Sequence, residues 1–364
     1  MNKPYEKETY FALTMDPVHI GTGGYRLGRV DNTITREPGT NLPKVPGTGI
    51  SGVARAFTAM AIQSENPMIP KKMKYQRPSR EITKKDGTKE IVYDSCAGKG
   101  GEKGDGHCGE PDCEVCVAYG FSKDGNSFQG MAQFFDARIL FFPVYSMLGP
   151  VWITSESIMR EFNIAGATLS DKERFKRFNA SLQIPEDKLN LGWLMLERED
   201  GEVNLTSLPS RTGTSPVPTT ILKREDGEVD KFLYVPQEIK DRLVLVSDKL
   251  FSRIVNDNLE VRTSVAIDPA TGAAVDGALY TYEAIPRATV LWFDVIYNKP
   301  ENFRIKQDGV DQPIKHDKAD GEGWKWIKEN VEKGLRLIEF MGVGGMNTRG
   351  MGRMRISGGG INGK

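Results

Sequence analysis

One segment constrains this chain more than any other. Residues 67–116 have little hydrophobic periodicity, much glycine and lysine, and all four cysteines of the protein. A segment so poor in periodic apolar residues cannot order itself by burying a core. Cys113 and Cys116 have the C-x2-C spacing of zinc sites, and Cys108 precedes them with C-x4-C spacing. In a reducing compartment such crowding indicates a metal cluster rather than disulfides. We therefore predict an insertion over 67–130 that bound Zn²⁺ orders.

The identity of the fourth zinc ligand stays open from the sequence. Cys96 and His107 both lie close to the run that ends in Cys116, and thiolate and imidazole are both zinc ligands. The predicted ligands are therefore Cys108, Cys113 and Cys116 with either Cys96 or His107. We expect a structural site, because nothing nearby supplies the general base that a catalytic zinc site needs. A set of inert free thiols is the alternative interpretation.

Outside this insertion, the hydrophobic pattern predicts an α+β fold. Residues 9–15 alternate as in a half-buried strand, and 137–142 are almost continuously apolar, which is typical of a strand buried on both faces. Apolar residues at helical spacing predict helices over 48–63, with Thr48 as N-cap, and over 324–341. Several short strands with one early and one late helix favour an α+β sheet over a doubly wound parallel sheet.

The polar middle of the chain, 197–235, is predicted to form a hairpin arm. Asp-Gly pairs at 200–201 and 226–227 are two-residue hairpin turn signals. The Ser-, Thr- and Pro-rich run between them, 207–218, is typical of a segment that projects from a core.

Composition limits the kinds of partner. The 49 Lys and Arg residues balance the 49 Asp and Glu residues, which argues against a surface that binds nucleic acid everywhere. Basic side chains gather locally in 71–85 and in the glycine-rich tail at 349–355, so any RNA site is expected to be local. No run approaches the roughly 18 apolar residues of a membrane span, and residues 1–10 do not resemble a signal peptide. We expect a cytoplasmic protein without membrane contacts.

An ordered series of motifs resembles the RAMP superfamily. The series comprises 16–23, Asp31, Arg36-Glu37, 42–48 leading to Arg55, 135–138, 261–263, 277–280 with Glu283, and 342–353. It runs over nearly the whole chain, and the order of the motifs is more specific than any one of them. Within the superfamily the chain most resembles the repeated backbone subunit of type III-B (Cmr-type) CRISPR effector complexes.

The resemblance implies an architecture and a function. The architecture is a modified RRM-like (ferredoxin-like) core over 1–364, with the insertion at 67–130 and a β-hairpin thumb within 197–235. Copies of such a subunit stack with other type III subunits along a guide CRISPR RNA, and each thumb displaces one nucleotide of the guide–target duplex. Base pairing reads the sequence, while the protein holds phosphates and sugars. The expected function is antiviral: RNA-guided cleavage of paired single-stranded target RNA at regular intervals.

The resemblance also implies roles for single residues. Asp31 takes the position of the cleavage aspartate. An ionised carboxylate there can bind Mg²⁺ or another divalent ion, or assist deprotonation of a ribose 2′-OH. Judged alone, a loop aspartate is more often a turn residue. The residues expected to contact RNA are His19, Arg36, Ser51, Arg55, Arg349 and Arg353.

The chain departs from the family pattern at two places. The family typically has a lysine where this chain has Ser51, so part of the guide-phosphate contact is expected at Arg55 or in 71–85. The acidic residue that is usual near 347–348 is absent. His19 is expected to contact RNA or to hold its glycine-rich turn rather than to act as a general acid or base.

Two other functions stay open from the sequence. One is a scaffold subunit of the same kind of complex that binds RNA without cutting it. The other is a guide-processing endoribonuclease of the same superfamily, acting alone as a monomer without a metal ion. Formation of RNA-dependent multimers would argue against the processing enzyme.

Overall fold

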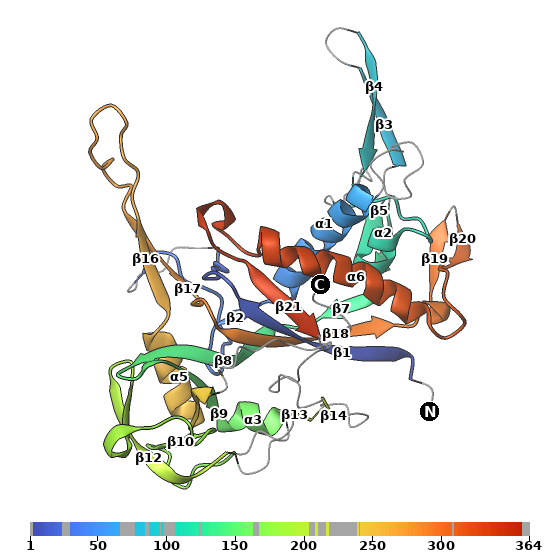
Figure 1. The fold of residues 1–364 in the computed structure, drawn as a ribbon. Helices are drawn as coiled ribbons and strands as arrows, with labels where there is room; N and C mark the ends of the chain where they lie inside the picture. Colours follow the sequence, from blue (N-terminus) through green and yellow to red (C-terminus); the bar gives the residue numbers. More distant parts are fainter. Residues whose placement is uncertain are drawn as a thin grey trace. The chain divides into compact units, whose positions relative to one another are not determined.

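The computed structural model divides into two compact units (Figure 1). Unit 1 comprises Met1–Thr9, Gly47–Asp136 and Asp294–Phe340, and unit 2 comprises Tyr10–Pro46, Ala137–Phe293 and Met341–Lys364. The structure describes residues 3–23, 30–65, 77–83, 87–94, 96–97, 106–123, 125–162, 167–203, 208–209, 216–217, 239, 241–307 and 309–358.

Unit 2 is built on a mixed sheet. Its strands are β1 (Tyr5–Thr14), β2 (Lys44–Val45), β8 (Ala137–Ser146), β9 (Gly149–Ser155), β10 (Phe175–Arg177), β11 (Lys188–Leu191), β12 (Leu194–Glu202), β15 (Leu243–Val246), β18 (Val290–Asn298) and β21 (Met354–Gly358). β1 and β18 contribute residues 10–14 and 290–293 to this unit. The strand order is β11-β12-β10-β15-β9-β8-β18-β1-β21, and β2 pairs with β8. The pairs β10–β12 and β9–β15 are parallel.

The core of unit 2 lies along the central strands. All four residues of β15 are buried, and β8 is buried at most of its positions, as the apolar run at 137–142 predicts. Helix α3 (Glu156–Glu161) follows β9, and α5 (Asp248–Asp257) buries Leu250, Phe251, Ile254 and Val255. Ser247 caps α5, because its hydroxyl accepts a hydrogen bond from the N–H of Leu250 at 3.4 Å. The short helices η2 (Pro185–Asp187) and η5 (Asn347–Arg349) also belong to this unit.

Unit 1 contains the two long helices, α1 (Gly47–Glu65) and α6 (Gly323–Met341), so both helices expected from the sequence are confirmed. They pack closely at Gly334, where a Cβ atom would lie 2.2 Å from the carbonyl oxygen of Ala54. The carboxylate of Asp136 accepts a hydrogen bond from the N–H of Gly47 at 2.8 Å. Helix α1 therefore begins one residue before Thr48, and the expected N-cap role of Thr48 is wrong.

The remaining elements of unit 1 are mostly short. They are β3 (Arg77–Thr83), β4 (Lys89–Asp94), α2 (Glu114–Tyr119), β5 (Gly120–Lys123), β6 (Asn126–Gln129), β7 (Ala132–Phe134), η4 (Pro300–Asn302), β19 (Arg304–Gln307) and β20 (Val310–Pro313). β3–β4, β5–β6 and β19–β20 form antiparallel pairs, and β7 pairs with residues 295–297 of β18. The chain thus combines a large mixed sheet, small antiparallel pairs and few helices, which confirms the predicted α+β class.

Parts of the predicted arm, the predicted basic run and the predicted insertion at 67–130 lie outside the described residues. Of the arm predicted at 197–235, the structure describes residues 197–203 and a small antiparallel pair, β13 (Leu208–Pro209) with β14 (Pro216–Val217). Of the basic run 71–85, it describes the backbone of β3 alone. Within the described ranges, no helix is long and apolar enough to cross a membrane.

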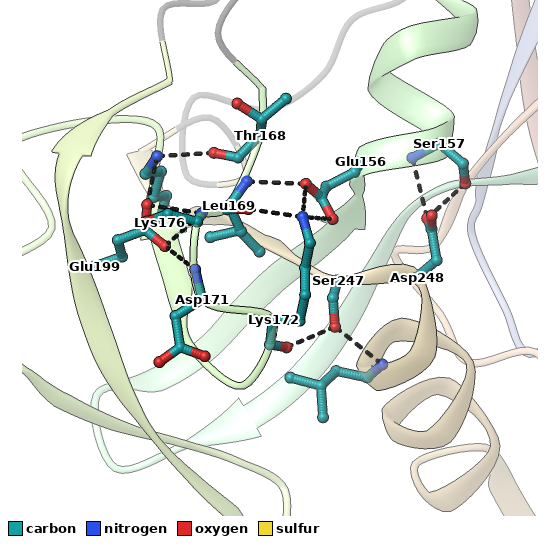
Figure 2. Close-up of polar contacts among 12 residues, drawn as sticks. Glu156, Ser157, Thr168, Leu169, Asp171, Lys172, Lys176, Glu199, Ser247 and Asp248 are labelled. Carbon is teal, nitrogen blue, oxygen red and sulfur yellow. Dashed lines mark hydrogen bonds and ion pairs between the residues drawn. The ribbon is translucent and has the colours of Figure 1, made fainter.

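Two carboxylates fix the loop that precedes β10 (Figure 2). Glu156, which is buried, accepts hydrogen bonds from the N–H of Leu169 at 2.8 Å and from Lys172 at 2.7 Å. Glu199 accepts from the N–H groups of Ser170 and Asp171 at 3.0 Å, and its carboxylate pairs with Lys176 at 2.8 Å. Burial opposes ionisation of Glu199, but Lys176 and these N–H groups outweigh it and lower the pKa of Glu199 to about 2.

We expect Glu199→Gln to lower the free energy of unfolding of unit 2 by about 2 kcal/mol at pH 7, because charged hydrogen bonds are lost. A folded-state pKa below the ordinary value of 4.5 stabilises the fold above pH 4.5. This contribution is lost as the pH falls toward 2. The free energies of unfolding of the wild type and the variant should therefore approach each other below pH 4.5. Urea denaturation from pH 7 to pH 3 measures the difference. Asp200→Asn, at a fully exposed position of the same strand, is the control, and a difference that stays constant with pH would contradict the assignment.

Candidate functional site

Asp31 lies beside Thr281 of β17 (Tyr280–Ala284), near the end of β17 that meets the loop connecting it to its antiparallel partner β16 (Glu260–Ser264). Its Oδ2 accepts hydrogen bonds from the backbone N–H of Thr281 at 2.7 Å and from the Thr281 hydroxyl at 2.9 Å. The N–H of Asp31 donates back to that hydroxyl at 3.1 Å. Residues 24–29, which precede this segment, lie outside the described residues.

These contacts keep the Asp31 side chain ionised while it stays exposed. The backbone N–H of Thr281, followed by its hydroxyl, lowers the pKa of Asp31 below its ordinary value. Oδ1 accepts no hydrogen bond from the residues that the structure describes. The arrangement therefore presents one fixed carboxylate oxygen to a ligand or a proton donor.

A partly buried ion pair between Arg36 and Glu283 supports the segment that carries Asp31. Glu283 of β17 is buried. Its carboxylate accepts hydrogen bonds from both terminal nitrogens of Arg36, at 2.6 and 2.9 Å, and from the N–H of Ile34 at 2.9 Å. The Nε of Arg36 donates to Asn256 of α5 at 3.0 Å. A bidentate pair of this kind holds both partners in one geometry. The Arg36 guanidinium thus joins the 30–36 segment to β17 and α5.

His19 is also buried in this region of unit 2. Its Nδ1 lies 2.7 Å from the carbonyl oxygen of Glu283, so Nδ1 carries the proton and donates. The His19 carbonyl accepts from the N–H of Gly345 at 2.9 Å. A Cβ atom on Gly344, where φ is +83°, would lie 2.4 Å from the same carbonyl, so this close approach requires glycine. The glycine-rich tail therefore packs against the His19 turn.

The two tail arginines have partners on the neighbouring elements. Arg349 donates to Ser264 at 3.2 Å and to the hydroxyl of Tyr280, and its guanidinium lies 5.8 Å from the Tyr280 ring centre. Arg353 donates to both carboxylate oxygens of Asp16, one at 3.1 Å. This contact is the main cause of the lowered pKa of Asp16. Both arginines remain exposed.

A cavity of about 630 Å³ opens beside the Arg36–Glu283 pair. Its lining includes Val30, Thr33, Asn256 and Leu259. Unit 2 thus brings five of the predicted residues into one region, and these are His19, Asp31, Arg36, Arg349 and Arg353. Sequence reasoning did not identify Thr281 and Asn256, since an isolated threonine or asparagine carries no signal of such a role. Glu283 belongs to a recognised motif, but its role emerges only from the contacts.

Unit 1 holds the other predicted residues. Ser51 lies half-buried on α1. On the same helix, Arg55 donates from Nε to the carbonyl oxygen of Cys96 and from Nη1 to that of Gly120, both at 2.8 Å. These two hydrogen bonds join α1 to the cysteine-containing insertion.

The four cysteines meet in unit 1. The sulfur atoms of Cys96, Cys108, Cys113 and Cys116 all lie within 4.8 Å of one another, and all four side chains are buried. Cys113 caps α2, because its sulfur accepts from the N–H of Cys116 at 3.4 Å. His107 is not a member of this group, and its Nδ1 accepts from the N–H of Ser122 at 3.1 Å.

The geometry of this cluster fits a tetrahedral metal ion. Four thiolates at about 2.3 Å from a zinc ion would be about 3.8 Å apart, and the sulfurs of Cys108 and Cys116 are 3.8 Å apart. Hydrogen bonding with Cys108 lowers the pKa of Cys116 and raises the pKa values of Cys96 and Cys113.

Comparison with known proteins decides the family. The model of the RAMP superfamily matches residues 12–355. The chain belongs to the RAMP superfamily. A relative within it, the CRISPR system Cmr endoribonuclease Cmr4 of Pyrococcus furiosus, is 22% identical over 289 residues, which are 77% of each protein.

Solved structures show that the fold is that of known RAMP proteins. A type III-B Cmr-beta complex bound to cognate target RNA contains a chain that matches with a TM-score of 0.57 at 12% identity, over 98% of both chains. The crystal structure of Cmr4 matches with a TM-score of 0.53 at 17% identity, over 98% of this chain and 100% of that one. Oligomeric Cmr4 from Pyrococcus furiosus matches with a TM-score of 0.52 at 15% identity, over 98% of both chains. The predicted RAMP fold is confirmed.

Proposed function

We propose that this RAMP protein is a backbone subunit of a type III-B CRISPR effector complex, which binds guide RNA and cuts the paired target RNA. The observation that carries the proposal is the exposed, ionised Asp31 carboxylate, which Thr281 of β17 fixes by two hydrogen bonds. The relatives support it, since one is named an endoribonuclease, one was solved with target RNA and one as an oligomer. The partners are guide RNA, target RNA, further copies of the chain and other type III subunits.

The chemistry assigned to Asp31 is activation of a ribose 2′-OH. Base pairing and backbone contacts hold the target ribose in place, so the remaining barrier is attack of its 2′-oxygen on the adjacent phosphate. Oδ1 of Asp31 accepts the 2′-OH proton while the 2′-oxygen bonds to phosphorus. The 5′-oxygen leaves with a proton from solvent. The products are a 2′,3′-cyclic phosphate and a 5′-hydroxyl.

A divalent ion such as Mg²⁺ would neutralise charge on the reacting phosphate when bound. Within the part of the chain that the structure describes, the one group of three or more metal-binding side chains is the cysteine cluster. If Asp31 holds this ion instead of accepting the proton, the protein would contribute that single carboxylate, with RNA phosphate and water as the other ligands. This is a common arrangement for Mg²⁺.

The metal that we assign to the cysteine cluster is Zn²⁺. Four thiolates in tetrahedral arrangement are typical of structural zinc sites and leave no open position for catalysis. Cys96 is the fourth ligand in this proposal, because its sulfur joins the other three. The ion then orders an insertion that has little core of its own.

The arm that displaces a nucleotide is assigned to 197–235. A second candidate is the hairpin of β16 and β17, whose connecting loop 265–279 projects from unit 2 (Figure 1). Ile267 and Leu279 in this loop are 55% and 66% exposed. Exposed apolar side chains can wedge between bases. Asp31 is bonded to Thr281, close to where this loop meets β17, which would place the cut beside the displaced nucleotide.

Purification of the natural complex with its bound RNA tests the proposed function. Sequencing of the bound RNA should return repeat-derived guide RNA. Measurement of the particle size should show RNA-dependent multimers, because a guide-processing enzyme would act as a monomer. Absence of guide RNA from the purified complex would contradict the proposed function.

Replacement of Arg349 and Arg353 by alanine is expected to weaken guide binding. Each phosphate contact that is lost should reduce the slope of log affinity against log salt by about 0.7. Filter binding from 50 to 300 mM salt measures the slope, with Lys249→Ala, an 88% exposed side chain on α5, as the control. An unchanged slope would show that these arginines only hold Asp16 and Tyr280 in place.

A further inference from the structure

Two cations donate hydrogen bonds to the backbone of the cysteine cluster. Arg55 of α1 reaches the carbonyl oxygen of Cys96, a cluster residue, and that of Gly120, which ends the helix carrying Cys116. Lys123 of β5 donates to the carbonyl oxygen of Cys108 at 3.2 Å. The two cations come from different elements, and both bond to segments that hold the sulfurs.

The negative charge of the zinc-bound cysteine cluster gives a reason for cations beside it. A zinc ion with four thiolates carries a net charge of −2, and these sulfurs are buried: three of the four cysteines are 0% exposed and Cys108 is 5% exposed. Burial of uncompensated charge is costly. Glu110 and Asp112 lie in the loop before α2, Glu114 begins α2, and all three add to the negative charge. Two positive charges beside the cluster would offset it.

The guanidinium of Arg55 also has an unused donor. Its Nη2 is buried and has no hydrogen-bond partner among the described residues. A buried donor without an acceptor is unfavourable. Ionised cluster sulfurs would add negative charge to the residue whose carbonyl Arg55 already contacts, Cys96, whereas neutral thiols carry no charge and accept only weakly.

We propose that Arg55 and Lys123 are positioning residues of the metal site, which hold its ligand segments and balance its negative charge. The proposal rests on the zinc assignment made above. It gives Arg55, whose expected role was RNA binding, a function within the insertion. Helix α1, which carries Arg55 and follows the 42–48 motif, would thereby contribute to the affinity for the metal ion.

The test measures Zn²⁺ affinity of the full chain by competition with a chromophoric chelator. Arg55→Gln is expected to bind zinc about 10- to 100-fold more weakly, the range typical of residues that support metal ligands. Lys123→Gln should weaken binding in the same direction. Arg55→Lys keeps the charge and should recover most of the affinity. The matched control is Arg304→Gln, because Arg304 also donates to backbone carbonyls, but to those of Glu301 and Phe303.

Loss of fold could also weaken apparent zinc binding, so the test needs a spectroscopic readout. With Co²⁺ in place of zinc, removal of a positive charge should move the thiolate-to-metal charge-transfer band of Arg55→Gln to longer wavelength, and Arg55→Lys should restore it. Arg55→Lys as weak as Arg55→Gln, with the band unmoved, would overturn the proposal. Equal affinity in all variants would overturn it too. A wild-type chain that takes up no zinc would remove both this proposal and the zinc assignment, whereas wild-type binding with unaffected variants removes this one alone.

Discussion

Asp31→Asn is expected to reduce target cutting by at least about 10²-fold while guide binding and assembly stay within twofold of the wild-type values. Asparagine has the shape of aspartate, and its side-chain oxygen can still accept from the N–H of Thr281, so the local fold should persist. What is lost is the negative charge that accepts a proton or holds a divalent ion. Because no phosphate contact requires a carboxylate, removal of that charge should leave RNA binding intact or slightly stronger.

The measurement uses the assembled complex with a labelled complementary RNA, with and without EDTA. Wild-type protein should yield products at regular spacing that end in a 2′,3′-cyclic phosphate. Asp187→Asn is the matched control, because Asp187 is another exposed aspartate with a lowered pKa, in its case caused by Arg198. A normal cutting rate in Asp31→Asn would show that the aspartate assignment is wrong. A wild-type complex that binds target but never cuts would instead favour the scaffold subunit.

Thr281→Val is a graded version of the same experiment. The substitution removes the hydroxyl that donates to Asp31 but keeps the backbone N–H, which is the larger cause of the lowered pKa. We expect a loss of cutting much smaller than that of Asp31→Asn, with unchanged guide binding. A loss as large as that of Asp31→Asn would mean that the hydroxyl itself takes part in the reaction.

The helices could be predicted from hydrophobic periodicity, and Asp31 could be predicted from the family motifs. Helices α1 and α6 were foreseeable because an apolar stripe at helical spacing requires a core on one side. Asp31 was foreseeable only through the motif order, since a loop aspartate has no local pattern of its own. Its partner Thr281 lies 250 residues away, and no local pattern records a contact between segments so distant in the chain.

Arginine roles were the least predictable part of the site. A positively charged side chain in a motif suggests RNA phosphate, yet the guanidinium of Arg36 is bonded to Glu283 and that of Arg55 to backbone carbonyls. Nothing in a sequence separates an arginine that holds its own protein from one that holds a ligand, because both need the same five N–H donors. Whether these arginines also contact RNA stays a prediction.

Removal of the metal from the cysteine cluster should have the largest effect on unit 1. We expect wild-type protein to carry about one zinc per chain and the double variant Cys113→Ser with Cys116→Ser to carry none. Zinc binding contributes folding free energy directly where little other core exists. Loss of the ion should therefore make the insertion at 67–130 sensitive to protease, and a chelator should do the same to the wild-type chain.

Single variants decide the fourth ligand, which spacing alone leaves open. Cys96→Ser should lose zinc, because the Cys96 sulfur lies within 4.8 Å of the other three. His107→Gln should keep it, because His107 accepts a hydrogen bond from Ser122 outside the cluster. Elemental analysis of protein prepared in metal-free buffer, followed by limited proteolysis, measures both effects. Retention of zinc by Cys96→Ser with loss from His107→Gln would reverse the ligand assignment. A wild-type chain without zinc but with a protease-resistant insertion would show that buried thiols alone order this segment.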